Sequence, residues 1–118
     1  MAQLQAQGVP VEVRSAHEHL PNVVGSFQAD RPGRHLVLNG HIDVFPAGPV
    51  ETWSRDPWSG AVGDGKVHGR GVADMKCGTT ASIWTYIYLH RLRERLGGRL
   101  TLTCVSDEEP AGPGVRNG

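Results

Sequence analysis

The chain has 118 residues and a mass of 12.7 kDa, which suits one small domain. Its 12 basic and 12 acidic residues balance, so neither a nucleic-acid surface nor a polybasic membrane patch is expected. No apolar run approaches the roughly 18 residues of a membrane span, and residues 1–15 lack the pattern of a signal peptide. The two cysteines, Cys77 and Cys104, are expected to be reduced thiols in a cytoplasmic protein.

The first third of the chain predicts short elements. Residues 2–7 read as the last turns of a helix, because Gly8 and Pro10 suit its end. Short strands are predicted over residues 11–13 and 23–27. Residues 34–39, RHLVLN, form an apolar run of strand length, which we interpret as a buried strand.

The rest of the chain predicts a loop, a hairpin, a helix and a strand. Residues 40–60 read as a long ordered loop, and Asp64-Gly65 is a hairpin turn signal. One helix is expected from Ala73 to Leu96, ended by Gly97-Gly98. Its apolar stripe is formed by Trp84, Tyr88, Leu92 and Leu96, with Ile83 and Ile87 beside them. Residues 99–106, RLTLTCVS, read as a strand that enters a core.

A helix between two strands predicts the α/β class with some parallel pairing. We expect a partial α/β/α sandwich with a mixed sheet. The helix without a beginning and the Gly/Pro-rich end, residues 110–118, further suggest a domain cut short at both ends. Residues 1–118 are therefore treated as one partial domain.

Three short segments concentrate imidazole and carboxylate groups, and each follows a strand or a hairpin. They are His41-Ile42-Asp43, the Gly-rich segment that contains Asp74, and Asp107-Glu108-Glu109. Because the carboxyl ends of strands in α/β sheets meet at one edge, these groups are expected to converge there. One imidazole with several carboxylates forms a nitrogen/oxygen site suited to zinc or a similar divalent ion.

Each segment taken alone also fits a structural role. A histidine after a strand is often a loop residue, and an aspartate before a helix is usually an N-cap. Three consecutive acids commonly form a solvated turn, although their mutual repulsion favours a cation nearby. Two further alternatives concern the loop: Trp53 and Trp58 are expected to pack it rather than to contact substrate, and Arg70 either pairs with a site carboxylate or is exposed.

The joint pattern resembles a known family. The runs are LNGHIDVFPAG, then W-x4-W-S-G-A-V-x-D-G-K-V-H-G-R-G-V-A-D-M-K, then TCVSDEE, and together they span residues 36–109. They are similar to the dinuclear-zinc amidohydrolase and peptidase superfamily of acetylornithine deacetylase, succinyl-diaminopimelate desuccinylase, aminoacylase and carboxypeptidase G. The resemblance implies a zinc-binding α/β catalytic domain, completed in the family by a lid and dimerisation domain, and therefore a homo-oligomer in the complete fold.

The resemblance also implies a role for each residue. His41, Asp74 and Glu109 would be metal ligands, with Asp74 bridging two zinc ions that Co²⁺ or Mn²⁺ could replace. Asp43 would accept the other N–H of the His41 ring, and Glu108 would be the general base that deprotonates the metal-bridging water. Family members often have a cis peptide after the bridging aspartate, here Asp74-Met75. The implied reaction is hydrolysis of amide bonds in N-acyl amino acids or small peptides.

The sequence departs from the family pattern after the Glu-Glu pair. A further acidic ligand, a final histidine ligand and the lid domain of the family have no counterpart in these 118 residues. Two readings therefore stand: a catalytic-domain piece that is active when completed, or a catalytically incomplete module that binds metal weakly or associates with a complete homologue.

Overall fold

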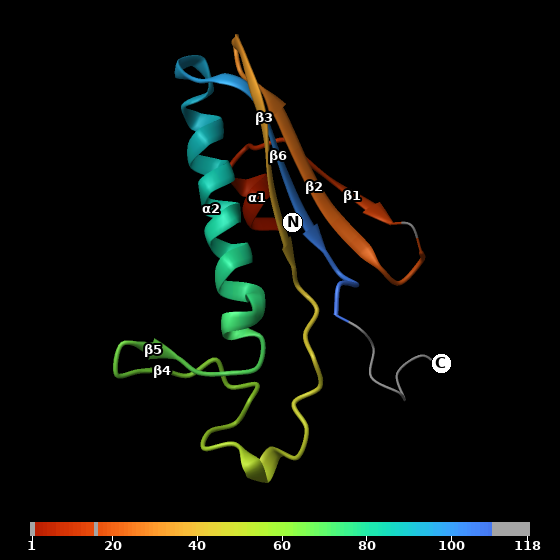
Figure 1. Cartoon of the computed structure of the whole chain (residues 1–118), viewed down its shortest axis with the longest axis vertical. Coiled ribbons are helices and arrows are strands. Elements are labelled where there is room, and N and C mark those ends of the chain that lie inside the picture. The colour runs from red at the N-terminus through yellow and green to blue at the C-terminus, as the bar shows by residue number, and fades with distance from the viewer. Residues whose placement is uncertain (1, 16, 110–118) are drawn as a thin grey trace.

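The computed structural model describes residues 2–15 and 17–109. Its main sheet has four strands, β1 (Val11–Ser15), β2 (Pro21–Gln28), β3 (Arg31–His41) and β6 (Gly97–Val105), in the order β1-β2-β6-β3 (Figure 1). β2 is antiparallel to β1 and to β6, whereas β3 and β6 are parallel. The predicted α/β class and mixed sheet are confirmed, and residues 110–118 lie outside the described part of the chain.

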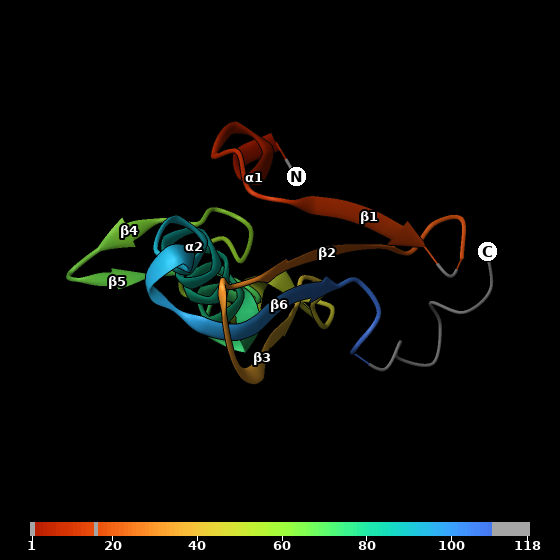
Figure 2. The same cartoon turned by 90° about the horizontal axis from the view of Figure 1, so that it is seen from above.

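Two helices and a small hairpin complete the fold. α1 (Ala2–Ala6) and α2 (Cys77–Arg91) pack into one core on the same face of the sheet (Figure 2). β4 (Val62–Gly63) and β5 (Lys66–Val67) form the predicted hairpin, and Val50–Thr52 and Arg93–Arg95 are single 3₁₀ turns. No helix among the described residues is long and apolar enough to cross a bilayer.

The core lies between α2 and the alternating inner face of β6. Leu100, Leu102 and Cys104 point into it, while the intervening threonines are only half-buried. Tyr86 and Ile87 of α2 are completely buried against them. The remaining buried members of this cluster are Leu4, Val9 and Phe27. The strand predicted for residues 99–106 is therefore confirmed, with its apolar side facing the helix.

The long helix is shorter than the sequence predicts at both ends. It begins at Cys77 rather than Ala73, because the backbone at Asp74 is extended, with φ −122° and ψ 101°. It ends at Arg91 rather than Leu96, because the chain leaves helical geometry at Leu92 and continues as a 3₁₀ turn. Gly97 and Gly98 therefore open β6 instead of ending the helix.

The predicted apolar stripe of this helix is wrong at its first three positions. Trp84, Tyr88 and Leu92 are 37%, 56% and 45% exposed. The buried line runs instead through Thr79, Tyr86 and Ile87, with Ile83 partly buried beside it. Apolar residues lie on more than one side of this helix, so helical spacing alone does not identify the side that meets the sheet.

The strand over residues 34–39 forms as predicted, but it is not buried. Leu36 and Val37 are 51% and 52% exposed. Among the described residues, β3 is an edge strand that pairs only with β6. An apolar run indicates a strand, but its exposure depends on neighbours that the run itself does not specify.

The buried Tyr86 should make the free energy of unfolding depend on pH above pH 10. Its hydroxyl donates to the Pro10 carbonyl oxygen at 2.8 Å, and burial raises the pKa of Tyr86 from 10.0 to about 12. Because the pKa of Tyr86 is raised in the folded state, the unfolded chain loses this proton first as pH rises. The contribution of protonated Tyr86 to stability is therefore complete below pH 10 and is lost as pH rises to about 12. We expect Tyr86→Phe to cost about 1 kcal/mol at pH 8. In urea unfolding, the advantage of the native chain over Tyr86→Phe should shrink above pH 10 and change sign before pH 12, because a pKa shift of this size is worth more than about 1 kcal/mol. A constant difference would contradict this account.

Candidate metal centre

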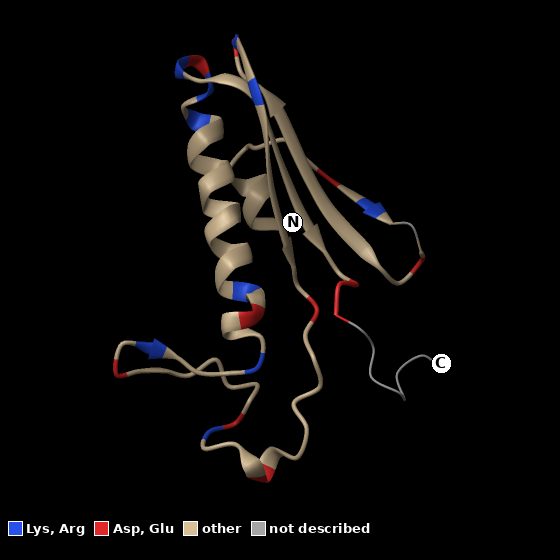
Figure 3. Ribbon diagram, in the orientation of Figure 1, with Lys and Arg blue, Asp and Glu red and all other residues tan. Residues whose placement is uncertain are grey.

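Two of the three chemistry-bearing segments leave the sheet side by side. His41 is the last residue of β3, and the parallel register pairs it with Val105, the last residue of β6. The Ile42 amide donates to the Val105 carbonyl oxygen at 2.9 Å, which holds the two segments together at the ends of β3 and β6. Acidic residues accordingly gather at this edge (Figure 3). The predicted convergence of these two segments at the carboxyl edge is confirmed.

The third segment reaches the same edge through the turn Val72–Lys76 that precedes α2. Asp74 lies in this turn, and the Asp74–Met75 peptide bond is cis, as the resemblance implies. The N-cap of α2 is Lys76, with no side-chain capping bond. The alternative role of Asp74 as an N-cap is therefore excluded, and its carboxylate is directed to His41.

The His41 ring is the centre of the cluster. Its side chain is almost fully buried, and its Nε2 atom lies 3.2 Å from Asp74 Oδ1. The same nitrogen is 3.8 Å from Glu108 Oε2 and 3.9 Å from Glu109 Oε1. One imidazole nitrogen thus faces three carboxylates that come from two different parts of the chain.

The other ring nitrogen fixes the orientation of the imidazole. His41 Nδ1 lies 3.0 Å from the main-chain carbonyl oxygen of Asp43 and 3.7 Å from Asp43 Oδ1. Because a carbonyl oxygen can only accept, Nδ1 is the donor, which directs the lone pair of a neutral ring at Nε2 toward the carboxylates. Asp43 therefore accepts the second N–H as the resemblance implies, but through its backbone rather than its carboxylate.

The Asp43 carboxylate holds the acidic segment in place. Its Oδ2 atom accepts the main-chain N–H groups of Glu108 at 3.0 Å and Glu109 at 2.8 Å. Burial alone would raise the pKa of Asp43, but main-chain hydrogen bonds, with those from Glu109 and Glu108 the strongest, act together with the charge of His41 to lower the pKa below its usual value. The Oδ1 atom is buried without a hydrogen-bond partner among the described residues. Asp43 therefore links the His41 and Glu109 segments as a charged, largely buried group.

The electrostatics of the cluster favour a cation. Burial disfavours the charged form of His41, yet the Asp43 carbonyl and the carboxylates of Asp74 and Glu108 together raise its pKa. The pKa of Glu109 is also raised; burial is the largest cause, and the negative charge of Asp74 is the second. Both shifts show that the cluster stabilises positive charge and disfavours further negative charge.

The donor set fits a divalent metal ion. His41, Asp74 and Glu109 each offer one ligand atom, and these atoms lie within 4.8 Å of one another. Three nitrogen and oxygen donors with an open fourth position suit a catalytic zinc site. Glu108 is outside this group, although its carboxylate also faces His41.

The loop between the hairpin and β3 is held by a different contact. The Arg70 guanidinium carbon lies 5.0 Å from the centre of the Trp53 ring, whose Nε1 donates to the Ala47 carbonyl at 2.8 Å. The expected packing role of Trp53 is thus confirmed, whereas Trp58 is 58% exposed and does not pack the loop. Arg70 stacks on an aromatic ring instead of pairing with a described site carboxylate.

Gly71 brings the turn that carries Asp74 against the segment that carries Asp43. Its φ of 76° favours glycine, and a Cβ atom there would collide with the Val44 side chain. We expect Gly71→Ala to lower the free energy of unfolding by about 3 kcal/mol through backbone strain and overpacking. Gly65→Ala is the matched control, since φ is 71° there and nothing lies within 4 Å. Equal losses in the two variants, measured by urea unfolding, would exclude a contribution from the Val44 contact.

The sequence reasoning missed one buried polar residue near the site. Thr79 is 3% exposed, and its hydroxyl donates to the His41 carbonyl oxygen at 2.8 Å. The signal that could have found it is helical spacing, because Thr79, Ile83 and Tyr86 lie on one side of α2.

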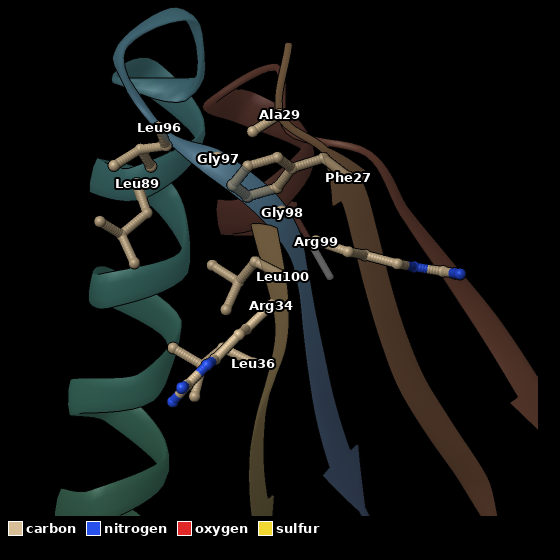
Figure 4. A pocket seen from close by; sticks show the side chains of 10 residues that line it. All are labelled: Phe27, Ala29, Arg34, Leu36, Leu89, Leu96, Gly97, Gly98, Arg99 and Leu100. Carbon is tan, nitrogen blue, oxygen red and sulfur yellow. The ribbon is translucent and has the colours of Figure 1, made fainter. Parts of the chain in front are cut away.

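An apolar pocket lies at the opposite end of the sheet from this site. Its lining comes from β2, β3, α2 and the beginning of β6, and includes Phe27, Leu89, Leu96 and Leu100 (Figure 4). β6 begins at this pocket and ends beside His41. The pocket therefore does not open onto the carboxylate cluster.

Comparison with known proteins agrees with this geometry. The sequence profile of peptidase family M20/M25/M40 matches residues 37–117. The chain belongs to this family. It is 35% identical over 112 residues to N-formyl-4-amino-5-aminomethyl-2-methylpyrimidine deformylase of Halalkalibacterium halodurans, a match that covers 93% of this chain and 26% of that protein. It is 43% identical over 84 residues to succinyl-diaminopimelate desuccinylase of Methylorubrum extorquens, covering 70% of this chain and 21% of that protein.

Solved structures of the M20 family share the fold. An M20 family metallo-carboxypeptidase, Sso-CP2 from Sulfolobus solfataricus, superposes with a TM-score of 0.74 at 24% identity, over 91% of this chain and 24% of that one. Human carnosine dipeptidase 1 gives a TM-score of 0.69 at 25% identity, over 97% of this chain and 26% of that one. The chain thus spans about a quarter of the length of these relatives.

Proposed function

We propose that this M20 chain holds a divalent metal ion, with zinc suiting the donors best, through His41, Asp74 and Glu109. The observation that carries the proposal is the position of His41 Nε2, which faces oxygen atoms of Asp74 and Glu109 at 3.2 and 3.9 Å. His41 donates from its other nitrogen to Asp43, so a neutral ring leaves Nε2 free to bind an ion. Co²⁺ or Mn²⁺ could replace zinc at such a site.

The reaction that we propose for the site is hydrolysis of an amide bond in an N-acyl amino acid or a small peptide. When bound, a divalent ion supplies Lewis-acid polarisation of the scissile carbonyl and lowers the pKa of water toward about 7. Glu108 is the general base: its carboxylate lies outside the donor group, is exposed, and remains within 3.8 Å of His41 Nε2. It takes a proton from the attacking water and returns it to the leaving amine.

The protein supports this role of Glu108 through Asp43. The two main-chain N–H groups bound by Asp43 Oδ2 belong to Glu108 and Glu109, so one carboxylate fixes both residues. Glu109 has a side chain that is 10% exposed, whereas that of Glu108 is 57% exposed. This difference in exposure supports the proposal that Glu109 binds the ion and that Glu108 meets substrate and water.

The substrate class is drawn from the chemistry named for the relatives. One is a deformylase and another a desuccinylase, and a structural neighbour is a dipeptidase. These names support a small acyl-amine or dipeptide substrate. A second subunit and the remainder of a longer chain could supply the further ligands that the resemblance implies.

The test combines metal content with turnover. The 118-residue chain is dialysed against zinc, its bound metal is measured by elemental analysis, and release of amine from N-acetyl, N-formyl and N-succinyl amino acids and from dipeptides is followed with and without chelator. Chelator-sensitive hydrolysis supports the full proposal. Tight zinc binding without hydrolysis restricts the proposal to the metal centre and favours the incomplete module, and absence of zinc binding overturns it.

A further inference from the structure

Thr79 is a buried polar residue in the first turn of α2 that the proposed chemistry does not use. Its side-chain oxygen donates to the main-chain carbonyl oxygen of His41 at 2.8 Å, with both residues buried. Burial shields this hydrogen bond from competing water. The bond joins the helix that follows Asp74 to the strand that ends at His41.

The backbone of β3 approaches Thr79 unusually closely. A Cβ atom on Gly40 would lie 2.5 Å from Thr79 Oγ1 and 3.3 Å from Thr79 Cα. Only glycine leaves room for the helix at this point, immediately before His41. Among the described residues, Thr79 supplies the hydrogen bond that joins α2 to β3, and it does so at the end of β3 where the site begins.

The relative position of His41 and Asp74 depends on the separation of α2 and β3. His41 is the last residue of β3, and Asp74 lies in the turn that leads directly into α2. The Lys76 amide donates to the Gly71 carbonyl at 2.9 Å, which ties the turn itself together. A shift of α2 relative to β3 would therefore carry Asp74 away from His41 Nε2.

We propose that Thr79 is a positioning residue of the metal centre. Its hydroxyl holds the backbone of His41 against the start of α2 and so keeps His41 Nε2 at 3.2 Å from Asp74 Oδ1. Thr79 is not among the metal-donor residues, and it acts through His41. The inference rests on the metal centre proposed above, but the geometry that it concerns can also be measured without metal.

Three variants of the 118-residue chain test this role. Thr79→Val keeps the branched shape and removes the donor, whereas Thr79→Ser keeps the hydroxyl. Thr101→Val is the matched control, because Thr101 lies on β6 and its hydroxyl contacts Ser26 and His35 instead of the site. Affinity for Co²⁺ and the visible spectrum of bound Co²⁺ are measured for each folded variant.

We expect Thr79→Val to weaken Co²⁺ binding by about 10-fold and to alter the spectrum, as for other residues that orient a metal ligand. Thr79→Ser should restore the affinity to within about 3-fold of the native chain, and Thr101→Val should leave both readouts unchanged. Native affinity and spectrum in folded Thr79→Val would overturn the proposal. So would a loss in Thr79→Ser as large as that in Thr79→Val.

A metal-free measurement separates this inference from the metal proposal. The His41 Nδ1 proton is donated to Asp43, and its exchange with water can be followed by NMR. We expect slow exchange in the native chain and in Thr79→Ser, and faster exchange in Thr79→Val. If the native chain binds no Co²⁺, the metal centre fails and this exchange alone decides the role of Thr79. If Thr79→Val does not fold, Thr79→Ala, which also removes the donor, decides it: faster exchange than in Thr79→Ser supports the proposal, and native-like exchange overturns it.

Discussion

Asp74→Ala is expected to weaken zinc binding by about 100-fold or more. Of the oxygens around His41 Nε2, Asp74 Oδ1 is the nearest, at 3.2 Å. Removing it leaves two of the three donor groups. Loss of residues that only orient a ligand costs about 10–100-fold in metal affinity, so loss of a ligand should reach the upper end of that range. Equilibrium dialysis with elemental analysis measures the change.

Asp107→Ala is the matched control for Asp74→Ala. It removes the same negative charge from the same edge of the sheet, but Asp107 does not belong to the donor group. The Asp74 side chain is 75% exposed, so neither variant should alter the free energy of unfolding by more than about 0.5 kcal/mol. Equal losses of zinc affinity in the two variants would mean that the edge attracts cations through its overall charge and that Asp74 is not a ligand.

The sequence predicts more of the candidate site than of the core. Strands that run parallel end at one edge, so placing His41 after one strand and Glu109 after another is enough to bring them together. Asp74 required more, because its turn is neither strand nor helix; the long motif around it supplied that information. The Asp43 backbone contact to His41 depends on details of packing that no residue spacing encodes. Helical spacing indicates that Thr79 lies on the same side of α2 as Tyr86, but it does not specify the bond from the Thr79 hydroxyl to His41.

The errors in the core have a common physical cause. Residues Leu36 and Trp84 are apolar and lie in a correctly predicted strand and helix, yet both are substantially exposed. Periodicity identifies an element, but burial depends on which neighbours cover it. β3 lies at an edge among the described strands, and the side of α2 that faces the sheet includes Tyr86 in the core and Thr79 against the end of β3. The side of α2 that is buried therefore includes the polar Thr79, whereas Trp84 and Tyr88 lie on an exposed side.

Glu108→Gln is expected to separate proton transfer from metal binding. Glutamine keeps the shape of the side chain and the main-chain N–H that Asp43 binds, but it cannot accept a proton from water. Removing a general base typically lowers a rate by about 10²–10⁴-fold. Since Glu108 lies outside the donor group, zinc affinity should stay within about 3-fold of the native value.

Glu109→Gln gives the contrasting result from the neighbouring residue. It makes the same chemical change, and its main-chain N–H also binds Asp43, but it replaces one of the three donor groups. We expect zinc affinity to fall by at least about 10-fold, with any hydrolysis restored only at high zinc concentration. The comparison remains decisive even without turnover, because Glu108→Gln should retain zinc where Glu109→Gln loses it. The reverse pattern would exchange the two roles, and equal losses would make both glutamates ligands and leave the proposed hydrolysis without its base.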